Sequence, residues 1–131
     1  MAQITHLLDT HVVVWALEDS PKLKPRARSI VAGAEWGELA ISDMTLLELA
    51  MLIQRKRILP DASLKDALRQ VGEEFIVVPI GSLEAELAVT LALPQGDPFD
   101  RVIIATALTL RVPLISADRE IAKSGLVETV W

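Results

Sequence analysis

Four acidic residues of this 131-residue chain stand at positions where carboxylates commonly do chemistry, although they are far apart in the sequence: Asp9, Glu48, Asp100 and Asp118. Asp9 and Asp118 each follow an expected strand, and Glu48 and Asp100 lie in the early turns of expected helices. In open α/β sheets, ligands and catalytic groups collect outside the carboxyl ends of the strands. The four acids can therefore converge at one edge of a sheet without being neighbours in sequence.

Considered one at a time, several of these acids also have a simple structural explanation. Asp is a favoured helix N-cap, which alone accounts for Asp9 and for Asp118 ahead of a short helical segment. Asp97 precedes Pro98, and this pair is typical of an N-cap followed by proline at the first helical position. We therefore assign Asp97 to capping.

Glu48 is the only charged residue between Asp43 and Arg55, in a helix that is apolar nearly all round. Such a helix is expected to be largely buried, and Glu is almost never fully buried unless it is paired or bound to something. Two explanations stay open. Glu48 either extends to the solvent-exposed rim of the helix or pairs with a basic side chain, or it is part of a functional site.

Asp100 lies on the same expected helix face as Ile103, Ile104 and Ala107, the face that should press on the sheet. A carboxylate in the first turn of that face would point into the crevice at the carboxyl ends of the strands. A first-turn acid also suits the helix dipole, so a purely structural role stays open for Asp100 as well.

Converged carboxylates repel one another and could not all stay ionised without a cation. Ligation by oxygen alone, with several retained waters, suits Mg²⁺ or Mn²⁺ rather than Zn²⁺. Such an ion polarises a phosphoryl group and lowers the pKa of a bound water. The hypothesis from the residues is therefore metal-dependent hydrolysis of a phosphodiester.

Strands that alternate with helices must position these acids, and the hydrophobic pattern predicts that alternation. Strands are expected before Asp9 and over residues 39–42, 75–79 and 112–116, with a fifth over residues 126–130. Helices are expected over residues 12–17, 26–34, 44–54, 63–74, 82–91 (capped by Ser82) and 99–110. This order predicts a single three-layer α/β domain over residues 1–131, with a central parallel sheet of four or five strands flanked by helices.

Composition narrows the function classes. The chain has no cysteine, which excludes disulfides, thiolate metal sites and thiol nucleophiles. Its formal net charge is -5, so any contact with nucleic acid needs a local basic patch or metal ions. Aromatic residues are only 4%, which argues against an extended base-stacking platform. With neither a membrane-length apolar run nor a signal peptide, we expect a cytoplasmic protein without membrane contact.

Other residue types give weaker signals. The two histidines, His6 and His11, receive no catalytic role, because no Gly-x-Ser-x-Gly nucleophile motif accompanies them. Arg55-Lys56-Arg57 is either a solvated helix end or a contact for RNA phosphates. Arg101 and Arg119 either steady a phosphate or offset local negative charge. The three tryptophans are expected in the core or at interfaces rather than as base-stacking residues: Trp15, Trp36 and Trp131.

The segments that contain the four acids resemble the acidic motifs of the PIN domain family, and above all those of VapC-type toxins. The similar segments are Leu7–His11, Ser42 with Leu47–Leu49, Asp97–Ala107 and Leu114–Asp118. The resemblance covers essentially the whole chain, and Asp-Pro-Phe-Asp-Arg is its most specific part. Members often carry a His shortly before this block, where this chain has Pro94-Gln95-Gly96. Ser116 stands where Thr is frequent.

The resemblance implies a metal-dependent endoribonuclease that cuts RNA, forms a homodimer and is inhibited by a cognate antitoxin covering the site. Carried over by position, the metal-binding acids are Asp9, Glu48, Asp100 and Asp118. One alternative is a non-catalytic PIN-like module that binds protein or RNA. Another is a phosphoacceptor of the haloacid-dehalogenase or receiver type. The haloacid-dehalogenase type requires Asp-x-Asp, where this chain has Asp9-Thr10-His11. The receiver type requires an acidic pair and a late Lys, for which this chain has no clear match.

Overall fold

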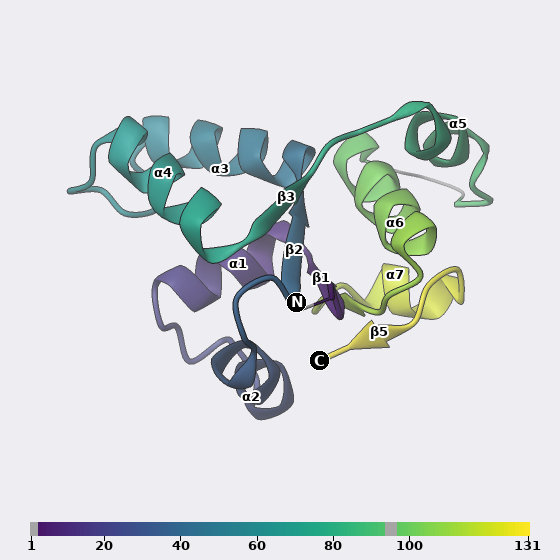
Figure 1. Ribbon diagram of the computed structural model, residues 1–131, viewed down its shortest axis with the longest axis horizontal. Coiled ribbons are helices and arrows are strands. Elements are labelled where there is room, and N and C mark those ends of the chain that lie inside the picture. Colours follow the sequence, from purple (N-terminus) through teal and green to yellow (C-terminus); the bar gives the residue numbers. More distant parts are fainter. Residues whose placement is uncertain (1–2, 94–96) are drawn as a thin grey trace.

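A computed structural model of the chain describes residues 3–93 and 97–131. Five short strands form one parallel sheet in the order β3-β2-β1-β4-β5 (Figure 1). The strands are β1 (His6–Leu8), β2 (Leu39–Ser42), β3 (Ile76–Val78), β4 (Leu114–Ile115) and β5 (Thr129–Val130). The all-parallel sheet, flanked by helices, confirms the predicted fold class.

Helices connect the strands. They are α1 (Thr10–Leu17), α2 (Pro25–Gly33), α3 (Asp43–Gln54), α4 (Leu64–Glu74), α5 (Ser82–Thr90), α6 (Pro98–Leu110) and α7 (Arg119–Ser124). The bounds of α1 to α6 match the predicted helices within two residues at each end. Within the two described ranges, no helix is long and apolar enough to cross a membrane.

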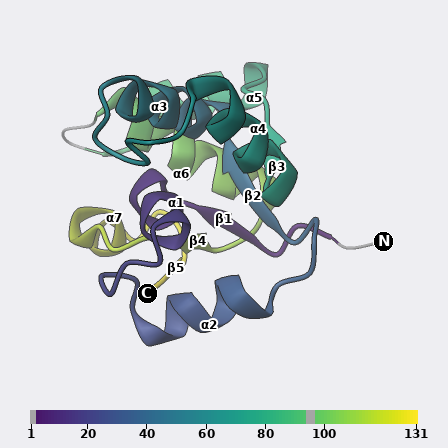
Figure 2. The same cartoon turned by 90° about the vertical axis from the view of Figure 1, so that its left-hand side faces the viewer.

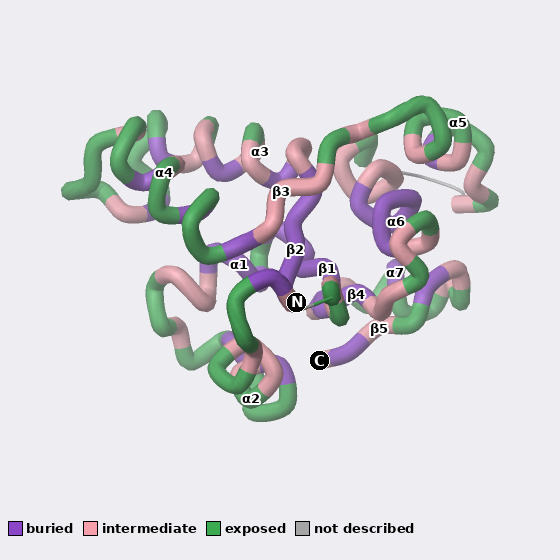
Figure 3. Tube along the Cα trace, viewed as in Figure 1, coloured by how far each residue is buried: buried purple, intermediate pink, exposed green. Residues whose placement is uncertain are grey.

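The sheet separates two layers of helices, and alternate side chains of each strand pack against different layers. Leu7 belongs to the core under α6 and α7, whereas the next residue, Leu8, belongs to the core under α1 to α4. Ala40 and Ile41 of β2 divide in the same way, because successive side chains of a strand point to opposite faces. Figures 1 and 2 show these helices on the two sides of the sheet, and Figure 3 shows the central strands buried. The result is a three-layer domain.

Side-chain caps begin most of the helices. The side chains of Ser42, Ser63 and Asp97 accept backbone N–H groups in the first turns of α3, α4 and α6. The prediction that Ser82 caps α5 is wrong. Gly81 is the N-cap and Ser82 is already helical, and a Cβ on Gly81 would lie 3.2 Å from a carboxylate oxygen of Glu84.

The prediction that α3 is largely buried is also wrong. Only Thr45, Leu49 and Ile53 of this helix are buried. Leu47 and Met51 are 51% and 39% exposed. The helix presents one face to the sheet and to its neighbours and leaves apolar side chains on the other, so its hydrophobic character does not measure its burial.

Candidate active site

The strand order brings the first and last predicted acids together. β1 lies between β2 and β4, and its Leu8 pairs with Ile115. The N–H of Asp9 continues this pairing by donating to the carbonyl of Ile115 at 3.0 Å. Asp118 follows β4 as the N-cap of α7. Both acids therefore leave the sheet at the same carboxyl edge.

Asp9 is the most tightly held acid of this edge and is only 6% exposed. One of its oxygens, Oδ1, accepts the N–H of Thr10 at 2.8 Å, and the other, Oδ2, accepts the hydroxyl of Ser116 at 2.7 Å. Burial raises the pKa of Asp9, against the lowering effect of the bonds from Ser116 and Thr10. The two bonds stabilise the ionised carboxylate and hold both of its oxygens in place.

Glu48 reaches the same edge from α3 and is held by α1. Its Oε1 accepts the hydroxyl of Thr10 at 2.7 Å, and that hydroxyl lies 3.0 Å from the hydroxyl of Thr45. When Glu48 is ionised, the Thr10 hydroxyl donates its only proton to the carboxylate. The bond between the two threonines is therefore donated by Thr45 and accepted by Thr10. Burial raises the pKa of Glu48, and the Thr10 bond opposes this effect. Sequence reasoning missed Thr10, whose signal was a hydroxyl directly after Asp9.

Asp100 and Asp118 complete the group. Burial, followed by the negative charges of Asp9, Asp97, Asp118 and Glu48 in that order, raises the pKa of Asp100 to about 6. Asp118 accepts the N–H groups of Glu120 and Ile121 through its Oδ1. Asp118 is therefore a helix cap, as one explanation predicted, and its carboxylate also lies in the acidic group.

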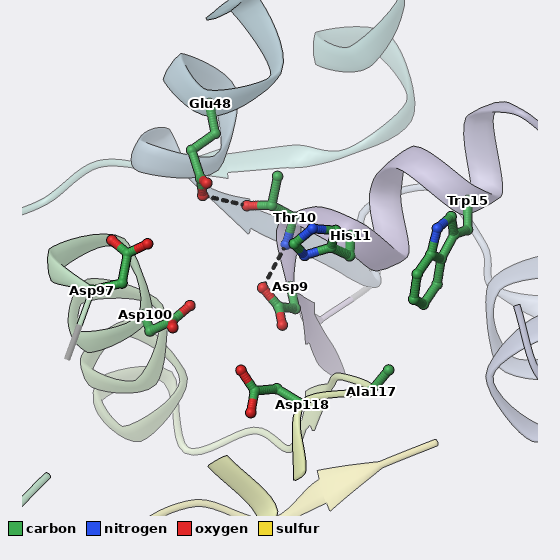
Figure 4. A pocket seen from close by; sticks show the side chains of 9 residues that line it. All are labelled: Asp9, Thr10, His11, Trp15, Glu48, Asp97, Asp100, Ala117 and Asp118. Carbon is green, nitrogen blue, oxygen red and sulfur yellow. Dashed lines mark hydrogen bonds between the residues drawn. The ribbon is translucent and has the colours of Figure 1, made fainter. Parts of the chain in front are cut away.

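All four predicted acids line one cavity of about 380 Å³ (Figure 4). Figure 4 shows the carboxylates of Asp9, Asp100 and Asp118 turned toward one another, with Glu48 approaching from α3. The full lining is Asp9, Thr10, His11, Trp15, Glu48, Asp97, Asp100, Ala117 and Asp118. Asp97 therefore caps α6, as predicted, and adds a fifth carboxylate to the cavity.

The donor set fits a hard divalent cation, because its charged ligand atoms are all carboxylate oxygens. Among the described residues, however, no three Asp, Glu or His side chains lie close enough to hold one ion directly. Burial, and after it the charges of the neighbouring carboxylates, raises the pKa of Asp100, so without a cation the site disfavours having all of these acids ionised. An ion that keeps several waters and reaches some of the acids through them fits this spacing, as Mg²⁺ commonly does.

The basic residues considered as phosphate contacts differ in whether their side chains are bound within the fold or exposed. The guanidinium of Arg101 donates to the backbone carbonyls of Ala88, Leu91 and Leu93, so it ties α6 to the end of α5. Arg119 is exposed at the start of α7, and residues 55–57 are exposed after α3. The position where relatives often carry a His, Pro94–Gly96, lies outside the described residues.

The profile of the PIN domain family matches residues 6–125. The chain belongs to the PIN domain family. This assignment excludes the phosphoacceptor alternatives and agrees with the resemblance of the acidic motifs.

One sequence relative and two solved structures illustrate this similarity. This PIN domain is 33% identical over 132 residues to ribonuclease VapC22 of Mycobacterium tuberculosis, covering 97% of this chain and 98% of the relative. Its fold is similar to that of the DNA-bound VapBC of Salmonella typhimurium, with a TM-score of 0.74, 14% identity and 98% of each chain covered. It is also similar to VapC20 of Mycobacterium tuberculosis, a toxin that cleaves the sarcin–ricin loop, with a TM-score of 0.71, 15% identity, and 95% of this chain and 98% of the other covered.

Proposed function

We propose that this PIN domain is a divalent-metal-dependent endoribonuclease that serves as the toxin of a toxin–antitoxin pair. The observation that carries the proposal is the cavity at the carboxyl edge of the sheet, which is lined by Asp9, Glu48, Asp100 and Asp118. The similarity to a VapC ribonuclease over nearly the whole chain supports RNA as the substrate. The VapBC complex among the similar structures supports an antitoxin partner.

Asp9, Glu48, Asp100 and Asp118 would hold Mg²⁺ or Mn²⁺, directly or through waters. When bound, the ion would polarise the phosphoryl group and lower the pKa of a water molecule. The protein contributes positioning. Ser116 and the N–H of Thr10 fix the two oxygens of Asp9, and the hydroxyl of Thr10 fixes Glu48.

The proposal includes a homodimer, which exposed apolar side chains on α3 and α5 support. Leu47 and Met51 lie on α3, and Leu83 and Val89, at 69% and 79% exposed, lie on α5. Both helices run along the upper side of the molecule in Figures 1 and 2. The two helices flank α6, which packs against both of them. Exposed apolar surface of this kind is typical of a protein interface.

The direct test is cleavage of RNA with and without Mg²⁺ by the wild type, by Asp9→Asn and by Asp61→Asn. Asp61 is exposed in the α3–α4 connection and is the matched control. We expect Asp9→Asn to lose cleavage and Asp61→Asn to keep it. If Asp9→Asn cuts as well as the wild type, the proposed site is wrong. If the wild type binds RNA equally in EDTA and does not cut it, the chain is a non-catalytic interaction module.

Metal binding can be tested apart from activity, because a ligand of the folded state raises its thermal stability. Mg²⁺ at about ten times its dissociation constant should stabilise the wild type by roughly 1.4 kcal/mol. Asp9→Asn should lose most of this stabilisation, and Asp61→Asn should keep it. A melting temperature of the wild type that is indifferent to Mg²⁺ would contradict the metal site.

A further inference from the structure

The cavity that holds the acids has a second wall that metal binding does not explain. On the side away from Asp100, the wall is formed by His11 and Trp15 of α1 and by Ala117, which follows β4 (Figure 4). This side offers two aromatic rings and a methyl group, and no carboxylate. One concave space therefore combines carboxylates at one end with an aromatic surface at the other.

Trp15 is partly buried and its indole is supported by other rings. Its centroid lies 5.4 Å from that of Trp131, the residue after β5, with an interplanar angle of 51°. The ring of His11 lies 6.0 Å away at 45°. Trp15 and Trp131 also pack against the core on the α1 side of the sheet. Because Trp15 is braced from within the fold, a ligand that stacks on it has little side-chain entropy to remove.

We propose that Trp15, flanked by His11 and Ala117, forms a subsite for one unpaired nucleobase next to the phosphodiester that the acids act on. This inference rests on the proposed ribonuclease function and adds a base-recognition element to it. Ligand pockets combine apolar walls with a few placed polar groups. A nucleotide has both matching parts, a phosphate for the metal-binding acids and a flat base for the indole.

The subsite agrees with the low aromatic content of the chain. Proteins that track long single strands stack successive bases on several aromatic side chains. A nuclease that recognises one splayed base needs a single rigid ring, and unpaired RNA bases commonly stack on Trp or His side chains. Trp36, in contrast, is 69% exposed and lines a different cavity, with Glu35, Glu73 and Glu74.

The test compares adenosine 5′-monophosphate with ribose 5-phosphate, because the two share the sugar phosphate and differ only in the base. Neither contains a diester, so neither can be cut. Each is titrated, with Mg²⁺ present, into ¹⁵N-labelled protein, and the indole N–H signals of the tryptophans are followed by NMR. The variants are Trp15→Leu, Trp15→Phe and, as the matched control, Trp36→Leu.

We expect the wild type and Trp36→Leu to bind adenosine 5′-monophosphate about five-fold or more tightly than ribose 5-phosphate, the low end of base–aromatic stacking. The indole signal of Trp15 should shift with the nucleotide only. Trp15→Leu should bind the two ligands equally, and Trp15→Phe, which keeps a ring, should retain part of the preference. Equal affinities in the wild type, or a preference that survives in Trp15→Leu, would overturn the subsite.

The outcome is independent of the nuclease assay. If the wild type fails to cut RNA but prefers the nucleotide through Trp15, the ribonuclease proposal falls and the base subsite stands. If it cuts RNA but shows no preference, the subsite alone is refuted.

Discussion

The hydroxyl of Ser116 donates a 2.7 Å hydrogen bond to Oδ2 of Asp9, across a separation of 107 residues in the sequence. The same oxygen of Ser116 accepts the N–H of Asp118 at 3.1 Å. One buried hydroxyl thus connects the end of β1 to the turn after β4. It links the carboxylate of Asp9 to the backbone of Asp118, a second proposed metal ligand.

Ser116→Ala should lower kcat/KM for RNA cleavage by about tenfold, because a hydrogen bond to a charged group is worth roughly 1.5–3 kcal/mol. The bond lowers the pKa of Asp9. Its loss raises that pKa, so the acidic limb of the pH–rate profile should move to higher pH. Ser116→Thr, which keeps the hydroxyl, should retain activity. Unchanged kinetics in Ser116→Ala would contradict this positioning role, and Ser20→Ala is a remote control.

Thr10→Val should weaken metal binding by about tenfold, since residues that orient metal ligands typically contribute 10–100-fold to metal affinity. The valine keeps the volume of Thr10 but leaves Glu48 without its 2.7 Å bond. The measurement is the Mg²⁺ concentration that gives half of the maximal thermal stabilisation. Thr10→Ser should restore the wild-type value, and a normal value in Thr10→Val would show that Glu48 does not need this bond.

Without metal, the carboxyl group of Asp100 should make stability depend on pH. Its pKa is raised from 3.8 to about 6 in the folded chain, so the stability it contributes is complete below 3.8 and is lost as the pH rises through about 6. In EDTA, Asp100→Asn should therefore melt higher than the wild type at neutral pH. Because the group is half exposed, we expect roughly 1 kcal/mol, or about 3 °C.

Calorimetry in EDTA across this pH range measures the effect. Burial raises the pKa values of Asp9 and Glu48 as well, so part of the slope should remain in Asp100→Asn. A variant that is no more stable than the wild type at neutral pH would contradict the burial and repulsion inferred at this position.

Arg101→Gln should destabilise the fold without changing how RNA binding depends on salt. The guanidinium donates to three backbone carbonyls around the end of α5, and its loss should cost about 2 kcal/mol. A phosphate contact would instead lower the salt slope by about 0.7 for single-stranded RNA. Affinities at several salt concentrations, in an Asp9→Asn background that leaves RNA intact, distinguish the two roles. A reduced slope would instead show that Arg101 contacts a phosphate of the RNA.

Leu47→Glu should convert the expected dimer to a monomer, because it places a charge among the exposed apolar side chains of α3 that the proposed dimer would bury. Size-exclusion chromatography with light scattering gives the mass of each variant. Trp36→Glu alters an exposed apolar residue outside α3 and α5 and should leave the dimer intact. A wild type that is monomeric at all concentrations would refute the homodimer.

Local chemistry explains why much of this protein could be predicted from its sequence. The bounds of the helices follow from hydrophobic period and from caps such as Ser42 and Asp97, which act within a few residues. Asp9, Glu48, Asp100 and Asp118 were recognisable because each sits in a fixed relation to a strand or helix end. Parallel strands bring their carboxyl ends to one edge, so the shared cavity followed from topology.

Only the tertiary structure decided which side chains meet at that edge. The bond from Ser116 to Asp9 depends on β1 pairing with β4, and the bond from Thr10 to Glu48 depends on α1 packing beside α3. Whether Leu47 is buried, or Arg101 turns inward, likewise depends on neighbours far along the chain. A residue's type and local spacing predict its helix and its face, but long-range pairing selects its partners.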